Sequence, residues 1–120
     1  MPRSWEPDLS HPPSPLGEVH VWRATLDQPA ALLSELERAL SDDEVARADR
    51  FRVEHGRRRY VAGRGFVRDV LSRYLARPAA SLRFALGAHG KPDLVGGPHF
   101  NLAHSGDLAL LAVTQVAPIG

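Results

Sequence analysis

The sequence predicts an α+β fold, in which helices pack on a small antiparallel sheet. Leucines and valines recur at helical spacing through the first two thirds of the chain. Short apolar stretches separated by glycine-containing turns fill the last third and are typical of strands. Helices that precede a group of strands favour this class over a parallel sheet, which requires alternating helices and strands. With 120 residues, the chain has the size of one domain.

The N-terminal segment differs in composition from the rest of the chain. Residues 1–16 are rich in proline and are expected to form a flexible lead, whereas 17–120 form the folded domain. Residues 18–24 alternate polar and apolar side chains, which predicts the first strand. This strand would place Val19, Val21 and Ala24 on one side.

Three helices are expected next. Leucines at helical spacing predict the first over 28–40. Ser41 and Glu44 form a capping-box pattern, which predicts a second helix over 42–50. A long third helix covers 53–77 and ends before Pro78, because the residue before a proline disfavours helical geometry. Strands are predicted at the positions 81–86, 99–104 and 108–116. The last is almost continuously apolar, which predicts a central strand covered on both faces.

Composition excludes several classes of function. The net charge of +1 argues against a general nucleic-acid-binding protein, and no aromatic platform accompanies Arg57, Arg58 and Arg59. The absence of cysteine excludes disulfides and thiolate metal sites. No apolar run approaches the length of a membrane span, and residues 1–16 lack the features of a secretory signal. We therefore expect a cytoplasmic protein that binds neither membrane nor nucleic acid.

One arginine of the long helix lies on its apolar margin. Helical spacing places Arg64 near Leu71 and Leu75, where a guanidinium requires a partner. Two interpretations are open. Arg64 forms an ion pair within the chain, with Glu54 or Asp69 as candidates, or it binds a ligand phosphate.

Two compact motifs follow the helix, Gly90-Lys91-Pro92 in a turn between strands and the segment 100–106 on a strand. Alternation places His104 on one face of this strand and Ser105 on the other, so a Ser-His-Asp relay with Asp107 is excluded. His99 and His104 also point to opposite faces, which excludes a metal pair. An isolated His104 would most simply be a hydrogen-bonded core histidine.

Together these motifs resemble the "GKP … FN-x-SHS" signature of the Sfp-type 4'-phosphopantetheinyl transferases. Residues 60–64 are similar to the "AGR" segment of that family, and 44–51 to its "E-x-x-R-x-x-R-F" stretch. Ala103 departs from the signature, which has serine there. The resemblance covers 18–120 and favours the ligand interpretation of Arg64. It implies coenzyme A contacts from Arg47, Arg64, His89, Gly90, Lys91, Pro92, Asn101, Ala103, His104 and Ser105.

The resemblance further implies one lobe of a two-lobed transferase. Such an enzyme moves phosphopantetheine from coenzyme A to a serine of an acyl or peptidyl carrier protein. Its magnesium ligands and general base belong to the second lobe, and their motifs would follow Gly120. We therefore expect no catalytic or metal-binding residue in this chain, no activity alone, and a homodimer across the apolar face that a second lobe would cover. The alternatives are a non-catalytic coenzyme A- or nucleotide-binding module and a small nucleic-acid-binding protein.

Overall fold

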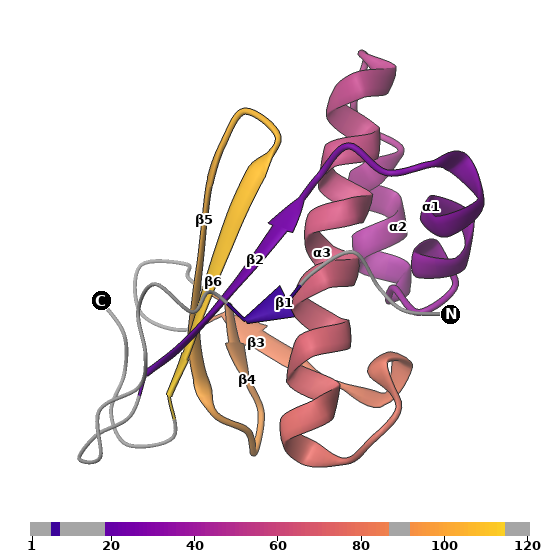
Figure 1. Cartoon of the computed structure of the whole chain (residues 1–120). Coiled ribbons are helices and arrows are strands. Elements are labelled where there is room, and N and C mark those ends of the chain that lie inside the picture. Colours follow the sequence, from indigo (N-terminus) through magenta and orange to yellow (C-terminus); the bar gives the residue numbers. More distant parts are fainter. Residues whose placement is uncertain (1–5, 8–18, 87–91, 115–120) are drawn as a thin grey trace.

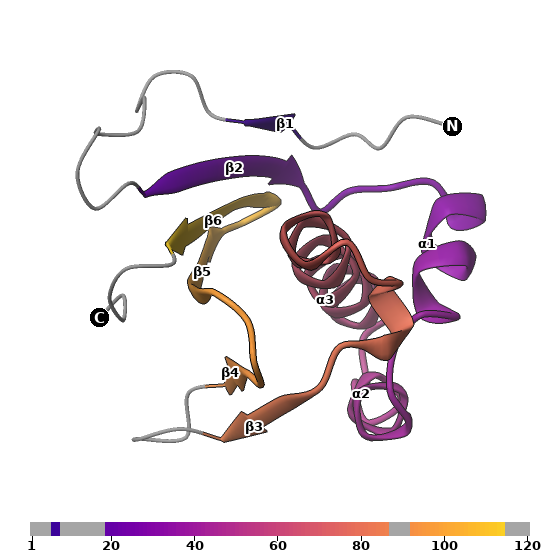
Figure 2. The same cartoon turned by 90° about the horizontal axis from the view of Figure 1, so that it is seen from below.

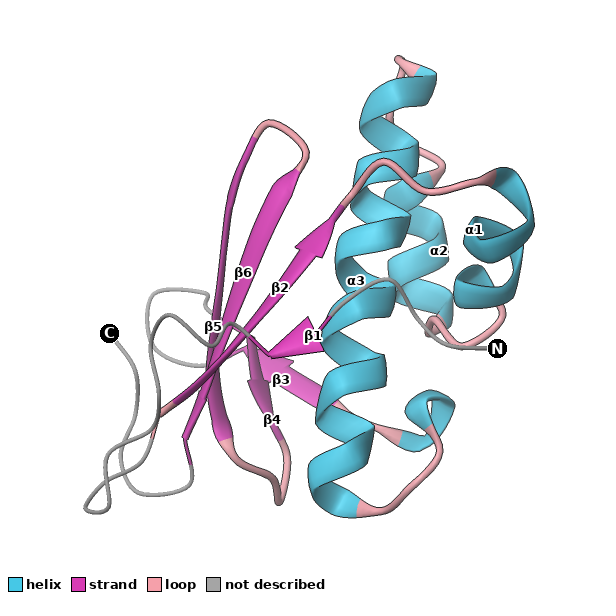
Figure 3. Cartoon of the chain, viewed as in Figure 1, coloured by secondary structure: helices cyan, strands magenta, loops and turns pink. Residues whose placement is uncertain are grey.

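The computed structural model describes residues 6–7, 19–86 and 92–114 (Figure 1). The helices are α1 (Ala30–Glu37), α2 (Asp42–Ala48), α3 (Glu54–Leu75) and a single 3-10 turn, η1 (Ala79–Ser81). The strands are β1 (Glu6–Pro7), β2 (His20–Thr25), β3 (Phe84–Leu86), β4 (Pro92–Leu94), β5 (His99–Ser105) and β6 (Leu108–Thr114). Helices and strands occupy separate parts of the chain, as Figure 3 shows, so the predicted α+β class is confirmed.

The strands form two antiparallel sheets. The larger has the order β1-β2-β6-β5, and the smaller pairs β3 with β4. The central pair joins the two ends of the domain, since His20 of β2 lies opposite Val113 of β6. Two strands, β1 and β4, were not predicted from the sequence. Strand β1 lies within the proline-rich segment, where Glu6 pairs with Arg23 and Pro7 with Trp22.

Helix α3 is the centre of the structure. It lies between the sheets on one side and α1 and α2 on the other (Figures 1 and 2). Its side chains Phe66, Val67, Val70 and Leu71 are completely buried, as is Leu111 of β6. Burial of such side chains contributes about 1.5–3 kcal/mol each, so their packing is a large favourable contribution to folding.

Local signals position the helices. The predicted capping box of α2 is present: the Ser41 hydroxyl accepts a hydrogen bond from the Glu44 backbone N–H at 3.2 Å, and the Glu44 carboxylate accepts one from Ser41 N–H at 2.8 Å. Helix α3 ends at Ala76, whose left-handed backbone (φ 52°) closes the helix just before Pro78.

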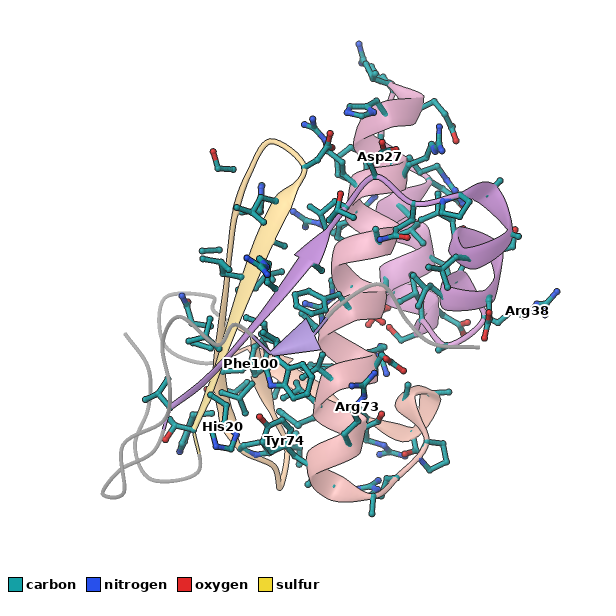
Figure 4. All side chains as sticks on the ribbon, viewed as in Figure 1. His20, Asp27, Arg38, Arg73, Tyr74 and Phe100 are labelled. Atoms are coloured by element: carbon teal, nitrogen blue, oxygen red, sulfur yellow. The ribbon has the colours of Figure 1, made fainter. Side chains whose placement is uncertain are left out.

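A polar contact fastens the end of α3 to the sheet. The Tyr74 hydroxyl accepts a hydrogen bond from Trp22 Nε1 at 2.8 Å and lies 2.9 Å from His20 Nδ1 (Figure 4). Burial raises the pKa of Tyr74, and the Trp22 N–H partly opposes this. Trp22 and Ala24 therefore share the core face of β2. The predicted grouping of Ala24 with Val19 and Val21 was wrong, because even- and odd-numbered residues point to opposite faces.

The strand β6 is central in the sheet but is covered on one face only. Ala109, Leu111 and Val113 are buried, whereas Leu108 is 48% and Leu110 36% exposed. The prediction of a strand covered on both faces was wrong, because in the part of the chain that the structure describes the helices lie on one side of this sheet. Its apolar composition reflects one face packed on α3 and a second that remains exposed.

Among the described residues, no helix combines the length and the apolar character needed to cross a bilayer.

Candidate functional site

A single carboxylate organises the contact between α2 and α3. Glu44 Oε2 accepts a hydrogen bond from Arg64 Nε at 2.8 Å, and Oε1 accepts one from Arg68 Nε at 2.7 Å. With the Ser41 N–H, three donors converge on this group, whose side chain is only 10% exposed. Burial acts to raise the pKa of Glu44, but the Ser41 N–H and the two arginines outweigh it and hold the pKa below its ordinary value.

The two arginines have different surroundings. Arg68 is 3% exposed, and its Nη1 also donates to the carbonyls of Ala79 and Leu82 at 2.8 and 3.0 Å. It therefore ties the segment after α3 back onto the helix. Arg64 is 15% exposed and has its Glu44 contact through Nε. The predicted ion pair of Arg64 within the chain is present, but its candidate partners Glu54 and Asp69 were wrong: the partner is Glu44, and Asp69 pairs with Arg73 one turn along the helix.

Aromatic rings lie against these cations. The Phe84 ring of β3 lies 4.9 Å from the Arg64 guanidinium carbon and 5.1 Å from that of Arg68. Arg47 of α2 lies 6.0 Å from the Tyr60 ring. Such contacts hold a guanidinium plane in place while leaving its edge accessible. Burial raises the pKa of Tyr60, and the nearby Arg64 opposes this effect.

Two hollows meet at this cluster. One, of about 600 Å³, lies between α2, α3 and β3 and is lined by Ser41, Asp43, Glu44, Arg47, Tyr60, Arg64, Arg68, Leu82, Arg83 and Phe84. The other, of about 390 Å³, lies between α2, α3 and β5 and is lined by Leu26, Arg47, Phe51, Gly56, Arg59, Tyr60, Gly63, Arg64, Leu102 and His104. Arg47, Tyr60 and Arg64 line both. We call the two together the basic groove; its apolar floor and cationic rim suit an anion that also carries apolar groups.

The structure brings three of the predicted site residues together. Arg47, Arg64 and His104 all line the hollow beside β5, although they come from three different elements. His104 reaches it because it shares the α3-facing side of β5 with Phe100 and Leu102. It is exposed at the strand end, so the simple interpretation of a core histidine was wrong.

Three other predicted residues lie on the opposite side of the sheet. Asn101, Ala103 and Ser105 alternate with the α3-facing residues of β5 and pair with Ala112, Leu110 and Leu108 of β6. We call this surface the outer sheet face; it comprises Val21, Arg23, Thr25, Asn101, Ala103, Ser105, Leu108, Leu110 and Ala112. The predicted site is thus divided between the basic groove and the outer sheet face.

The predicted turn falls mostly outside the described residues. His89, Gly90 and Lys91 lie there, and Pro92 begins β4. The strands on either side, β3 and β4, pair with each other. The strand predicted to follow the turn was 99–104, whereas the structure has the additional strand β4, which includes Pro92.

The tip of the β5–β6 hairpin is fixed to the start of α3. Arg59 Nε donates to Asp107 Oδ1 at 2.8 Å, His55 Nε2 lies 3.7 Å from the same oxygen, and Leu26 N–H donates to the Asp107 carbonyl. Asp107 is thus engaged away from His104, which agrees with the exclusion of a hydrolase relay. In the described ranges, no group of three His, Asp or Glu side chains could hold a metal ion.

Sequence reasoning missed two members of the groove. Phe84 carries no motif, and its position under two guanidinium groups depends on how β3 returns to α3. Arg68 belongs to none of the motifs, and its burial depends on the segment after α3 that it contacts. The capping-box residue Glu44 was a signal for this arginine cluster, because a carboxylate in the first turn of a short helix can face a basic neighbouring helix.

Comparison with known proteins gives one consistent result. The family model described as "4'-phosphopantetheinyl transferase, N-terminal" matches residues 20–116. The chain is 45% identical over 108 residues to the 4'-phosphopantetheinyl transferase HetI of Nostoc sp., covering 86% of this chain and 46% of HetI. It is 32% identical to a putative 4'-phosphopantetheinyl transferase of Synechocystis sp., covering 88% of this chain and 44% of the relative. A 4'-phosphopantetheinyl transferase of Bacillus pumilus is 34% identical, with shares of 73% and 38%.

The chain therefore spans less than half the length of these relatives. The matched residues run from β2 through β6 and include the whole basic groove. By sequence, this chain belongs to the 4'-phosphopantetheinyl transferase family and corresponds to its N-terminal part.

Proposed function

We propose that this chain is the coenzyme A-holding part of a 4'-phosphopantetheinyl transferase, which transfers phosphopantetheine to a serine of an acyl or peptidyl carrier protein. The observation that carries the proposal is the convergence of Arg47, Arg64 and His104 on one groove with an apolar floor. The names of the relatives support the reaction class.

The residues of the groove have different proposed functions in ligand binding. Arg47 and Arg64 supply cationic N–H donors for phosphate oxygens, and a phosphate bound by several such donors is held by charge-assisted hydrogen bonds. His104 lines the same hollow and can add a further N–H donor. Leu26, Phe51 and Leu102 exclude water beside these groups, which strengthens the electrostatic attraction. Lys91, with its neighbours in the turn, stays a predicted contact.

The other predicted contacts require a ligand that reaches both surfaces. Asn101 and Ser105 lie on the outer sheet face, so coenzyme A would pass the end of β5 to contact them as well as His104. We keep them, with the backbone of Ala103, as proposed contacts of the distal part of the ligand.

Among the described residues, no group of three or more His, Asp or Glu side chains could hold a metal ion. We derive no step through the ion. We propose that the metal ligands and the general base are supplied by residues outside this chain, and that the chain alone does not catalyse transfer.

Calorimetric titration with coenzyme A tests the proposal. We expect Arg47→Gln to weaken binding about tenfold, the loss of roughly one charge-assisted hydrogen bond. Arg38→Gln is the matched control, because this substitution removes the same charge elsewhere. Arg38 is exposed at the end of α1 and points away from the molecule (Figure 4). Absence of coenzyme A binding, or equal losses in both variants, would contradict the proposal.

A transfer assay with a carrier protein and magnesium separates the transferase from a non-catalytic coenzyme A- or nucleotide-binding module. Turnover by the chain alone would show that the proposed division of the catalytic groups is wrong. Transfer that occurs only when the C-terminal part of a relative is added supports the transferase. Coenzyme A binding without transfer, with or without that added part, supports the non-catalytic module.

Nucleic-acid binding is disfavoured by the contacts of the arginine run. Arg57 pairs with Glu37 and Asp49, Arg58 donates to a backbone carbonyl, and Arg59 pairs with Asp107. Two of these three cations, Arg57 and Arg59, are paired with carboxylates, and a cation whose charge is neutralised in this way attracts a phosphate backbone weakly. We therefore retain the proposal of a cytoplasmic protein without a nucleic-acid partner.

We also propose that the isolated chain forms a homodimer through the outer sheet face. Leu108 and Leu110 leave an apolar patch there, and apolar patches favour association. Sedimentation of the wild type should show a concentration-dependent dimer that Leu110→Glu abolishes. A wild-type monomer at all concentrations would refute this proposal.

A further inference from the structure

Glu44 binds two arginines, but it leaves them in different states. Arg68 uses Nε for Glu44 and Nη1 for two carbonyls, so most of its donors are occupied. Arg64 uses Nε alone, since its one hydrogen bond in the described structure goes to Glu44 Oε2. Both terminal amino groups of Arg64 thus remain without a protein acceptor among the described residues.

These amino groups lie where a ligand can reach them. No described side-chain nitrogen or oxygen is both buried and without a hydrogen bond, so the Nη atoms of Arg64 contact solvent. Arg64 lines both hollows of the basic groove. The accessible edge of its guanidinium therefore faces the groove, while Phe84 supports the plane of the group at 4.9 Å.

We propose that Glu44 is a positioning residue, which holds Arg64 through Nε so that its two Nη groups present a fork to a phosphate of coenzyme A. This inference rests on the proposed function. A guanidinium held in this way loses little side-chain entropy when it binds a phosphate, because its orientation is fixed before the ligand arrives. Glu44 is itself held by the Ser41 N–H and Arg68, which prevents it from following Arg64 into the groove.

Charge alone predicts the opposite effect. Glu44 is an anion beside a site for an anion, and removal of a nearby negative charge should strengthen phosphate binding. Positioning predicts a weaker complex, because the released Arg64 loses its orientation. The sign of the change in coenzyme A affinity therefore distinguishes the two effects.

The test uses Glu44→Gln, with Asp43→Asn as the matched control. Asp43 is the preceding residue on α2, is exposed, lines the same hollow and makes no side-chain hydrogen bond with the described residues, so the control removes an equal charge without a positioning contact. We expect Glu44→Gln to lower the affinity for coenzyme A about tenfold. Asp43→Asn should leave this affinity unchanged or raise it. Equal or stronger binding by Glu44→Gln would overturn the inference.

Arginine side-chain NMR of the full chain supplies a readout that a merely structural role would not move. With coenzyme A absent, the Nε–H signals of Arg64 and Arg68 should be protected from exchange in the wild type. In Glu44→Gln the Arg64 signal should lose protection, and coenzyme A should shift the Arg64 signal more than that of Arg68 in the wild type. An Arg64 signal that stays protected in the variant would contradict the inference.

A second variant covers the case in which Glu44→Gln does not fold. Arg64→Lys keeps the charge and a contact with Glu44 but removes the two Nη groups that face the groove. The affinity for coenzyme A should therefore again fall about tenfold. Unchanged affinity in Arg64→Lys would overturn the inference. Failure of the wild type to bind coenzyme A would overturn the proposed function as well, whereas binding that neither variant changes would overturn the positioning role alone.

Discussion

The unequal burial of Arg64 and Arg68 predicts unequal effects on stability. Replacement of Arg68, which is 3% exposed, by Met removes the second donor to Glu44 Oε1, which keeps the Ser41 N–H, and the donor to two carbonyls, of which Ala79 keeps the Leu82 N–H and Leu82 is left without a partner among the described residues. Breaking a buried ion pair in this way costs about 3–5 kcal/mol of unfolding free energy. Replacement of Arg64 by Met removes one hydrogen bond from a carboxylate that keeps Arg68 and Ser41, which costs about 1–2 kcal/mol.

Urea unfolding followed by circular dichroism measures the difference. A gap of about 2 kcal/mol corresponds to roughly 1 M between the two midpoints, because a small domain loses about 1–3 kcal/mol per molar urea. Methionine is chosen for both positions because it keeps an apolar stem without the guanidinium. Equal midpoints, or a larger loss for Arg64→Met, would refute the assignment of Arg68 to structure and of Arg64 to the groove.

Three further effects are expected. Gly65→Ala should destabilise the fold by about 1–3 kcal/mol, because the added Cβ would lie 2.8 Å from Leu36 Cβ. At Gly63 an added Cβ would lie 3.9 Å from the nearest side chain, that of Leu26, so Gly63→Ala should stabilise the fold by up to about 1 kcal/mol through helix propensity. Thermal melts of the two variants measure the difference. The lowered pKa of Glu44 means that its ion pairs stabilise the fold above the ordinary value of 4.5 and that this stability is lost as pH falls through the folded pKa. Urea midpoints between pH 6 and pH 3, roughly the range over which such carboxylates titrate, should therefore fall more steeply in the wild type than in Glu44→Gln. Gly106→Ala should cost about 1–2 kcal/mol, because the hairpin tip has a φ of +58°, and unchanged stability there would contradict the observed turn.

The fold was largely predictable because its signals are local. Helical spacing and the Ser41–Glu44 capping box gave α1 to α3 to within a few residues, and glycines separated the strands. Strand β1 could not be predicted, because two residues in a proline-rich segment carry no periodicity. The sequence also could not show whether one or both faces of β6 are covered, since an apolar run has the same pattern in either case.

The site was predictable in part. The motifs identified Arg47, Arg64 and His104, and strand alternation correctly placed Asn101 and Ser105 on the face opposite His104. What could not be predicted is which carboxylate meets Arg64, because the pairing depends on how two helices cross. Within-helix spacing suggested residues of α3 itself, whereas the observed partner belongs to α2.

The pairing of β2 with β6 has a consequence for the order in which the domain can fold. These strands come from opposite ends of the described chain, and their pairing places Trp22 opposite Leu111 in the middle of the larger sheet. The α-helices and the β3–β4 hairpin use nearby residues and can form while the chain is still being synthesised, but β2 has no central neighbour until residues 108–114 are available. During that interval the edge of β2 that later pairs with β6 is open, and aggregation of nascent or C-terminally shortened chains should begin there.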